Sequence, residues 1–231
     1  TIDVSLLEFY VREELNKTCP RVMVVTNEVK LVITNYPEGE QEKVEAINNP
    51  EDESQGKREM SFSKYLYIER EDFKETANRK FFRLTIGKEV RLKNAYIIKG
   101  EKCIKNKNGE LIEIHCTYDP KSKSGSNSKE SKRKVKGTIH WVDIQSSIDV
   151  TINEYDRLFL NEKPEENDDL IKGINTCSKK RLLGKSEKHV SSLAKGQRVQ
   201  FQRKGYYIVD KAKKGEITFN KTVSLRDSWK K

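Results

Sequence analysis

Residues 19–36 read CPRVMVVTNEVKLVITNY and contain two short runs rich in β-branched residues, Val22–Val25 and Val29–Tyr36. Pro20 cannot continue a preceding helix, so it marks a change in the pattern of the chain. Runs of this length, separated by turn-forming residues, are typical of strands. The stretch therefore predicts the beginning of a β-rich fold.

Before this stretch, residues 3–16 have the pattern of one amphipathic helix. Val4, Leu7, Val11 and Leu15 share a face at helical spacing, and Asp3 is suited to cap its N-terminus. After it, the strand pattern recurs, at Lys64–Ile68, Phe81–Ile86, Glu89–Leu92, Ala95–Lys99, Leu111–Tyr118, Val135–Val142, Ile148–Glu154, Arg198–Phe201, Tyr206–Val209 and Thr218–Leu225. So many short strands with little helix between them predict antiparallel barrels or sandwiches.

Turn signals divide these strands. Asn108-Gly109 is the clearest hairpin signal, and we expect it to form a type I′ turn. We expect solvated surface loops at residues 37–58, 121–134 and 161–170. The second of these is rich in Ser and Lys, and we expect it to be flexible and able to contact phosphates.

The composition bounds the class of protein. The 231 residues carry a formal net charge of +10, which suits a polyanionic partner such as nucleic acid, although a merely soluble basic protein fits equally well. No apolar run approaches the roughly 20 residues that span a bilayer, and the N-terminus has no signal-peptide pattern. Four cysteines without metal-ligand spacing fit a reduced cytoplasmic compartment. Because Thr1 replaces an initiator Met, we expect a processed chain or a fragment.

Signatures of catalysis are missing from the sequence. It has no GxxxxGK[ST] phosphate loop, no GxSxG elbow and no HExxH zinc motif. The three histidines, His115, His140 and His189, are dispersed along the chain. Spacing alone does not exclude an active site assembled from distant strands, but a binding module is the better hypothesis.

Two segments have the residue types that read single-stranded RNA, whose unstacked bases are bound by aromatic stacking and by forked donors. Residues 78–83 (NRKFFR) mix cations with aromatic rings. Residues 88–93 (KEVRLK) alternate, so that Glu89, Arg91 and Lys93 share one face of a strand. A solvated strand face remains the alternative interpretation.

Several blocks of the sequence, in order, resemble the anticodon-binding region of glutaminyl-tRNA synthetases. The blocks are residues 19–25, 29–36, 68–73, 84–96, 134–142, 155–159 and 219–229. The resemblance extends from near residue 5 to the end of the chain. Its specificity comes from the number of blocks and their order rather than from any single motif.

The resemblance implies an all-β fold of two antiparallel β-barrels, of the ribosomal-protein-like anticodon-binding type, with a short N-terminal helix. Residues 1–19 would end the helical connector from the catalytic domain. Residues 20–77 and 155–231 would build the proximal barrel, and 78–154 the inserted distal barrel. The implied partner is the anticodon loop of glutamine tRNA, bound by a monomer. The HIGH and KMSKS motifs occur nowhere, so the fragment would be non-catalytic and need no cofactor, while ATP with Mg would bind in the parent enzyme's absent catalytic domain.

The resemblance also implies roles for single residues. Arg21, helped by Gln200, would reach the middle anticodon uridine, and Arg83 the last base, a guanine. Arg91 and Lys93 would form the pocket of the first base. The remaining implied binding residues are Asn16, Lys80 and Arg203.

Three positions depart from the family pattern. Lys80 replaces a glutamine that is common in relatives, Phe82 a lysine and Lys93 an arginine. Lys93 keeps the charge but lacks the planar fork with which an arginine would read the first base strictly. Phe82 exchanges a cation for a ring that could stack on a base or belong to the core.

Two other classes of protein stay open at this point. A ribosomal-type RNA-binding protein could use a related barrel, although it should need only one. The equivalent region of a glutamyl-tRNA synthetase shares this architecture in some lineages. The block around Gln200 and Arg203, together with Arg91 and Lys93, favours glutamine.

Overall fold

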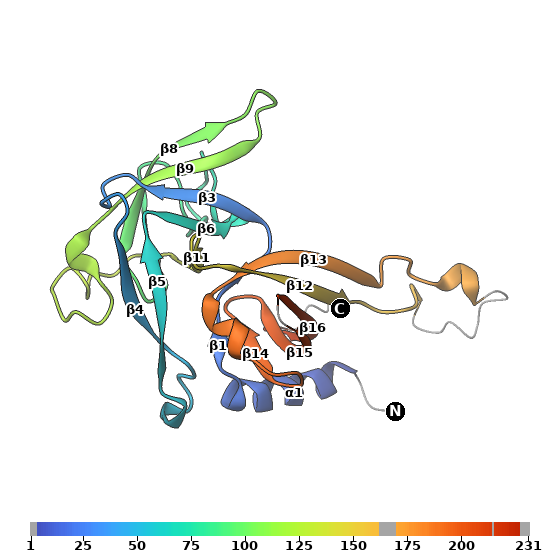
Figure 1. The fold of residues 1–231 in the computed structure, drawn as a ribbon. Coiled ribbons are helices and arrows are strands. Elements are labelled where there is room, and N and C mark those ends of the chain that lie inside the picture. The colour runs from blue at the N-terminus through green and yellow to red at the C-terminus, as the bar shows by residue number, and fades with distance from the viewer. Residues whose placement is uncertain (1–3, 162–169, 214, 227–231) are drawn as a thin grey trace.

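The computed structural model describes residues 4–161, 170–213 and 215–226, and its strands form two barrel-like sheets (Figure 1). The predicted cap at Asp3 and nearly all of the predicted loop 161–170 lie outside these residues. The helix α1 (Val4–Thr18) packs beside one sheet, the helix-side barrel, through Leu15 and Cys19. The other sheet forms the far barrel.

The helix-side barrel is a seven-stranded sheet in the order β1-β14-β15-β16-β12-β13-β2. Its strands are β1 (Arg21–Val22), β2 (Val24–Val25), β12 (Ile148–Tyr155), β13 (Lys179–Ser186), β14 (Arg198–Phe201), β15 (Gly205–Lys213) and β16 (Glu216–Ser224). Short 3₁₀ turns, η5 (Ile171–Gly173) and η6 (Lys188–Ser192), flank β13.

The far barrel is a second seven-stranded sheet, in the order β10-β7-β8-β9-β3-β6-β11. Its strands are β3 (Glu28–Ile33), β6 (Tyr65–Glu69), β7 (Glu89–Leu92), β8 (Ile97–Lys105), β9 (Leu111–Tyr118), β10 (Thr138–Ile139) and β11 (Trp141–Asp143). A two-stranded ribbon, β4 (Gln41–Ile47) with β5 (Lys57–Ser63), runs along it, and the β8–β9 hairpin projects from it (Figure 1). The 3₁₀ turns are η1 (Glu53–Gln55), η2 (Arg70–Asp72) and η3 (Pro120–Ser122).

The prediction of an all-β fold with two barrels and a short N-terminal helix is confirmed. The strands are not all antiparallel, however: β1–β14, β7–β10, β12–β16 and β3–β9 pair in parallel. Each sheet has at its two edges a pair of strands that are consecutive in the chain. Only Met23 separates β1 from β2, and only His140 separates β10 from β11. One bent segment therefore nearly closes each barrel.

Residues 22–25 have no solvent-facing side. Side chains alternate across a strand, and here Val22 and Val24 lie in the core of the helix-side barrel while Met23 and Val25 lie in that of the far barrel. All four are completely buried. The continuous apolar run in the sequence is thus the wall that the two barrels share.

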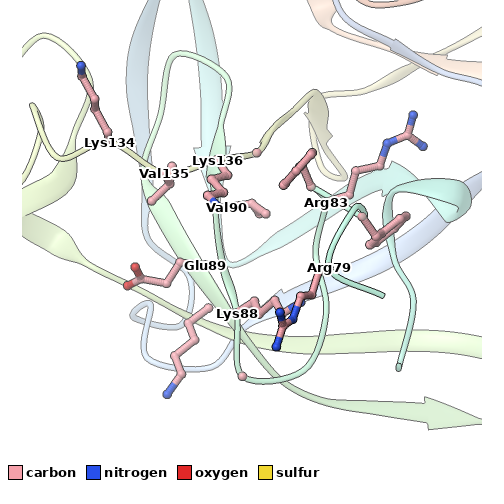
Figure 2. A pocket seen from close by; sticks show the side chains of 13 residues that line it. Arg79, Arg83, Lys88, Glu89, Val90, Lys134, Val135 and Lys136 are labelled. Atoms are coloured by element: carbon pink, nitrogen blue, oxygen red, sulfur yellow. The ribbon is translucent and has the colours of Figure 1, made fainter. Parts of the chain in front are cut away.

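Three elements of the structure differ from the prediction. The ribbon β4–β5 extends into the predicted loop 37–58, because β4 buries only Val44 and Ala46 and presents charged side chains on its other face. The strand β13 is missing from the prediction, because only two of its eight residues, Leu182 and Leu183, are large and apolar. Phe81–Ile86 is not a strand but a coil with two isolated bridges, and Arg83 in this coil lines the edge of a pocket (Figure 2).

The hairpin at Asn108-Gly109 is confirmed, but its turn type is not. A type I′ turn needs two residues with positive φ, and in this turn only Gly109, at 81°, has one. The amide of Gly109 donates to the carbonyl of Asn106 at 3.0 Å, and Asn106 Oδ1 accepts from the amide of Glu110. The loop is therefore a type I turn followed by a glycine bulge.

The predicted apolar face of the first helix is only partly packed. Leu15 is buried and Val11 half-buried, whereas Val4 and Leu7 are exposed. Helical spacing correctly indicated the helix, but within the described residues only its C-terminal half contacts a core.

The strand pairing divides the chain differently from the predicted boundaries at 77 and 154. The resemblance implies that residues 20–77 and 155–231 form one barrel and that residues 78–154 form a second barrel inserted between them. Instead β3 and β6 belong to the same sheet as β7–β11, since the chain passes from one barrel to the other at residues 26–27, directly after β2. A barrel made from two separated stretches is present, but its stretches are 21–25 and 148–224.

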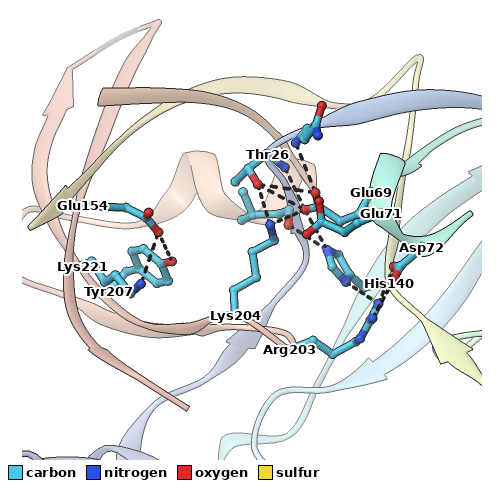
Figure 3. A network of polar contacts seen from close by, with 12 residues as sticks. Thr26, Glu69, Glu71, Asp72, His140, Glu154, Arg203, Lys204, Tyr207 and Lys221 are labelled. Carbon is cyan, nitrogen blue, oxygen red and sulfur yellow. Dashed lines mark hydrogen bonds and ion pairs between the residues drawn. The ribbon is translucent and has the colours of Figure 1, made fainter. Parts of the chain in front are cut away.

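The junction between the barrels is polar and buried (Figure 3). The carboxylate of Glu69, at the end of β6, accepts from the amides of Thr26 (2.9 Å) and Asn27 (3.2 Å). The Nζ of Lys204 lies 2.7 Å from it and the Nε2 of His140 3.4 Å. Burial alone would raise the pKa of Glu69, but its contacts with His140 and Lys204 outweigh that cost and lower the pKa to about 2.

This junction predicts a dependence of stability on pH. A carboxyl whose pKa is lowered on folding stabilises the fold above its unfolded pKa, so the contribution of Glu69 should be complete above pH 4.5 and vanish as the pH falls toward 2. The free energy of unfolding should lose about 3 kcal/mol over this range from Glu69 alone. Urea unfolding at a series of pH values measures it. Glu69→Gln should flatten the curve, whereas Glu59→Gln, at an exposed position, should not; equal slopes in both variants would contradict the assignment.

A second prediction concerns the close approach of Gly137 to the coil at Phe82. A Cβ on Gly137 would lie 2.3 Å from the carbonyl oxygen of Phe82, so the backbone must shift to accept one. Gly137→Ala should lower the melting temperature more than Gly125→Ala, where φ is 84° but no atom lies within 4 Å. Thermal unfolding of both variants provides the comparison, and an equal or smaller loss for Gly137→Ala would show that the contact is easily relaxed.

Candidate nucleic-acid interface

A basic pocket of about 730 Å³ lies between the coil 79–83 and the segment 134–137 (Figure 2). The start of β7 forms its floor. Its charged lining consists of six cations and one carboxylate: Arg79, Arg83, Lys88, Lys99, Lys134, Lys136 and Glu89. Its shape and charge suit an anionic ligand.

Aromatic rings line the same pocket. Phe82 is 52% exposed, and the Nζ of Lys136 lies 5.6 Å from the centre of its ring. Phe81 lies beside it, under Lys74. An exposed ring among cations is the combination that binds an unstacked base together with its phosphates. Phe82 therefore belongs to the surface and not to the core.

Arg83 is held at the rim of this pocket by the buried carboxylate of Asp72. Its Nε lies 3.3 Å from Asp72 Oδ1, and its Nη1 donates to the carbonyl of Glu71 at 3.1 Å. Arg203 binds the same carboxylate from the other barrel, with Nη2 2.7 Å from Asp72 Oδ1, and also contacts His140 (Figure 3). Asp72 thus links Arg83 and Arg203, and with them the pocket and the barrel junction.

Arg21 lies in a separate cluster beside the helix. It is only 4% exposed, and its guanidinium donates to the carbonyl of Cys19 (3.0 Å), to Asn49 Oδ1 and to Asn16 Oδ1 (2.8 Å). Burial lowers the pKa of Arg21. Gln200, paired in register with Arg21 across β1 and β14, donates to the hydroxyl of Tyr206 at 2.9 Å.

This cluster borders a groove. Asn16, Gln200 and Tyr206 line a hollow of about 880 Å³ between the first helix and β15. Tyr206 also donates to Asn16 Oδ1 at 3.3 Å, which closes the cluster. The structure therefore brings three of the predicted residues, Asn16, Arg21 and Gln200, into one polar group.

Arg91 alternates along β7 with the buried Val90 and Leu92, as predicted, whereas Lys93 lies in the turn that directly follows the strand. The guanidinium of Arg91 is not free. It donates hydrogen bonds to four oxygen atoms of the segment 121–134. These bonds fix a segment that its Ser- and Lys-rich composition predicts to be flexible. Burial lowers the pKa of Arg91. Lys93 is half-buried, and its carbonyl accepts from the indole of Trp141 at 2.9 Å.

The eight predicted binding residues thus fall into three groups, with Lys80 apart in an exposed turn where its amide donates to Asn78 Oδ1. The groups are Asn16, Arg21 and Gln200; Arg83 and Arg203; and Arg91 and Lys93. Sequence reasoning missed Asn49, Asp72 and Tyr206, whose polar groups bind Arg21, Arg83, Arg203 and Gln200. It also missed Glu69, which binds Lys204 at the barrel junction, and the pocket lysines Lys134 and Lys136. Of these residues, only the two lysines could have been found from the sequence, because they belong to a basic segment.

The described residues contain neither a metal-binding cluster nor a membrane-spanning helix. No group of three or more His, Cys, Asp or Glu within residues 4–161, 170–213 and 215–226 could hold a metal ion. Among the helices of the same residues, none combines the length and apolar character that crossing a membrane requires.

Known proteins that are similar to this chain bind RNA, as the basic and aromatic pocket suggests. Two models of the same description, the anti-codon binding domain of class I tRNA synthetases (E and Q), match residues 19–119 and 138–210. Across its full length the chain is 50% identical to a glutamine–tRNA ligase of Rhodopirellula baltica and 47% identical to one of Clostridium perfringens. It is 44% identical to one of Idiomarina loihiensis.

The chain spans about two fifths of the length of these relatives, covering 39%, 42% and 41% of them. The two matched regions leave out the N-terminal helix, the segment between the matches and the last strand. Together with the two barrels and the basic, aromatic pocket, they show that the chain belongs to the anticodon-binding domains of class I tRNA synthetases for glutamate and glutamine.

Proposed function

We propose that this chain is the anticodon-reading part of a glutamine–tRNA ligase and that it binds the anticodon loop of glutamine tRNA. The observation that carries the proposal is the pocket around Arg83 and Phe82, where a forked donor and an exposed ring stand among lysines. The similarity of the whole chain to part of glutamine–tRNA ligases supports glutamine over glutamate. The attachment of glutamine with ATP and Mg would belong to a catalytic domain outside this chain.

In this proposal each group of residues reads one part of the loop. Arg83 faces the last base, a guanine, which an arginine fork recognises by two hydrogen bonds. Arg21 and Gln200 face the middle uridine. Because Arg21 is 4% exposed, the base would have to replace one of its internal partners, such as Asn16. Lys93 lies beside the first base, while Asn16, Lys80 and Arg203 support the loop.

We place the protein in the cytoplasm as a monomer. All four cysteines are free thiols, which fits a reducing compartment. The monomeric state rests on the resemblance alone, and sedimentation equilibrium measures it.

Binding assays with three transcripts test the proposed function. Glutamine tRNA should bind more tightly than glutamate tRNA or a glutamine tRNA with a scrambled anticodon, since the bases and not only the phosphates are contacted. Affinity should fall steeply with salt, because lysine–phosphate contacts release counterions. Equal binding of all three transcripts would contradict anticodon reading, and tighter binding of glutamate tRNA would favour the glutamyl alternative.

Arg83→Ala should cost about 1–3 kcal/mol of binding free energy and relax discrimination at the last anticodon base. The measurement compares the affinities of two glutamine tRNA variants that differ only at that base. Arg79→Ala, in the same pocket, is the matched control, and we expect it to weaken both variants equally. If Arg83→Ala also weakens both equally, Arg83 contacts phosphate only.

A further inference from the structure

The segment 121–134 is a basic loop held by one side chain. It reads KSKSGSNSKESKRK, with six cations and a single carboxylate. Lys121, Lys129, Lys132 and Lys134 are exposed. None of the four has an ion pair among the described residues, whereas Lys123 pairs with Glu42 and Arg133 with Glu89. The loop therefore presents four lysines that no carboxylate of the described chain neutralises.

Arg91 holds this loop at both ends. Its Nη1 donates to the carbonyl of Ser122 (3.0 Å) and to Ser124 Oγ (3.3 Å). Its Nη2 donates to the carbonyls of Ser131 (2.8 Å) and Arg133 (3.2 Å). A guanidinium has five N–H groups, so these contacts leave only Nε–H, which is too few for a bidentate contact with a base.

The main chain of Arg91 extends the same connection. Its amide donates to the carbonyl of Gly137 at 2.9 Å, in the parallel pairing of β7 with β10. Between the carbonyl of Arg133 and Gly137 lie Lys134 and Lys136, which form one wall of the basic pocket (Figure 2). The side chain and the amide of Arg91 thus fix that wall from either end.

We infer that Arg91 is a positioning residue that holds the loop 121–134 as a phosphate-binding platform, and that it does not read the first anticodon base. The inference rests on the proposed function for the identity of the RNA. The exposed lysines of the loop contact the tRNA backbone, and Arg91 acts through them. Lys93, two residues further along the chain in the turn after β7, stays available to the base.

Hydrogen–deuterium exchange of the free chain tests the first half of the inference. Arg91→Ala should speed exchange at the amides of residues 121–136 by at least tenfold and leave β3, β6 and β9 unchanged. Lys93→Ala is the matched control and should change neither region. Unchanged exchange in the loop of Arg91→Ala would overturn the inference. This measurement needs no tRNA, so it stands even if glutamine tRNA does not bind and the proposed function fails.

Binding to two glutamine tRNA transcripts that differ only at the first anticodon base tests the second half. Arg91→Ala should weaken both about tenfold and keep their ratio, whereas Lys93→Ala should change the ratio. A changed ratio in Arg91→Ala would show that Arg91 reads the base and overturn the inference.

A second variant covers the case in which Arg91→Ala does not fold. Replacing Lys121, Lys129, Lys132 and Lys134 by Gln keeps every hydrogen bond of Arg91. It should weaken both transcripts equally and reduce the salt slope by up to about 3, since each phosphate contact with a single strand contributes roughly 0.7. Where Arg91→Ala does fold, adding it to the lysine variant should have little further effect on affinity. An unchanged salt slope in the lysine variant, or full additivity of the two changes, would overturn the inference.

Discussion

The whole structure depends on one strand segment with two buried faces. Residues 22–25 place alternate side chains in two different cores, so the same segment completes both barrels. Arg21 precedes this wall directly, and Thr26 and Asn27, which donate to Glu69, follow it. Polar contacts at both ends are therefore positioned by a completely buried segment of the chain. A set of side chains that reads RNA needs such a support, since small displacements weaken forked hydrogen bonds.

Beyond the apolar wall, the two barrels are joined by buried charged side chains. Asp72 is completely buried, and Arg203 and Arg83 approach its carboxylate from two directions. An ion pair in this setting contributes more to geometry than to net stability, because desolvation offsets most of the attraction. The geometry that it fixes is that of Arg83 at the rim of the pocket. The same carboxylate binds a residue of the helix-side barrel, so the position of Arg83 depends on how the two barrels meet.

The class of fold could be predicted because β-branched runs and turn residues recur along the chain, and the resemblance supplied the pair of barrels. The predictions failed for elements whose apolar residues line a pocket or whose exposed face is charged. Phe81 and Phe82 look like a strand, but their rings serve a pocket. The ribbon β4–β5 looks like a loop because its second face is charged. The resemblance also identified Arg91 as a binding residue. Its partners are mostly main-chain carbonyls, and because every residue has a carbonyl, the sequence does not predict these contacts.

The two kinds of cation are used differently on this surface. Arg21, Arg91 and Arg203 are engaged by oxygens of the protein itself, where a planar fork gains most from fixed acceptors. The exposed cations of the pocket and loop are mostly lysines, whose hydrated ammonium groups on flexible stems suit phosphates that vary in position. Arg83 stands between these uses, oriented by Asp72 yet with 41% of its side chain exposed. An oriented but accessible fork is what recognition of a single base requires, because the protein and not the ligand then bears the entropic cost of fixing it.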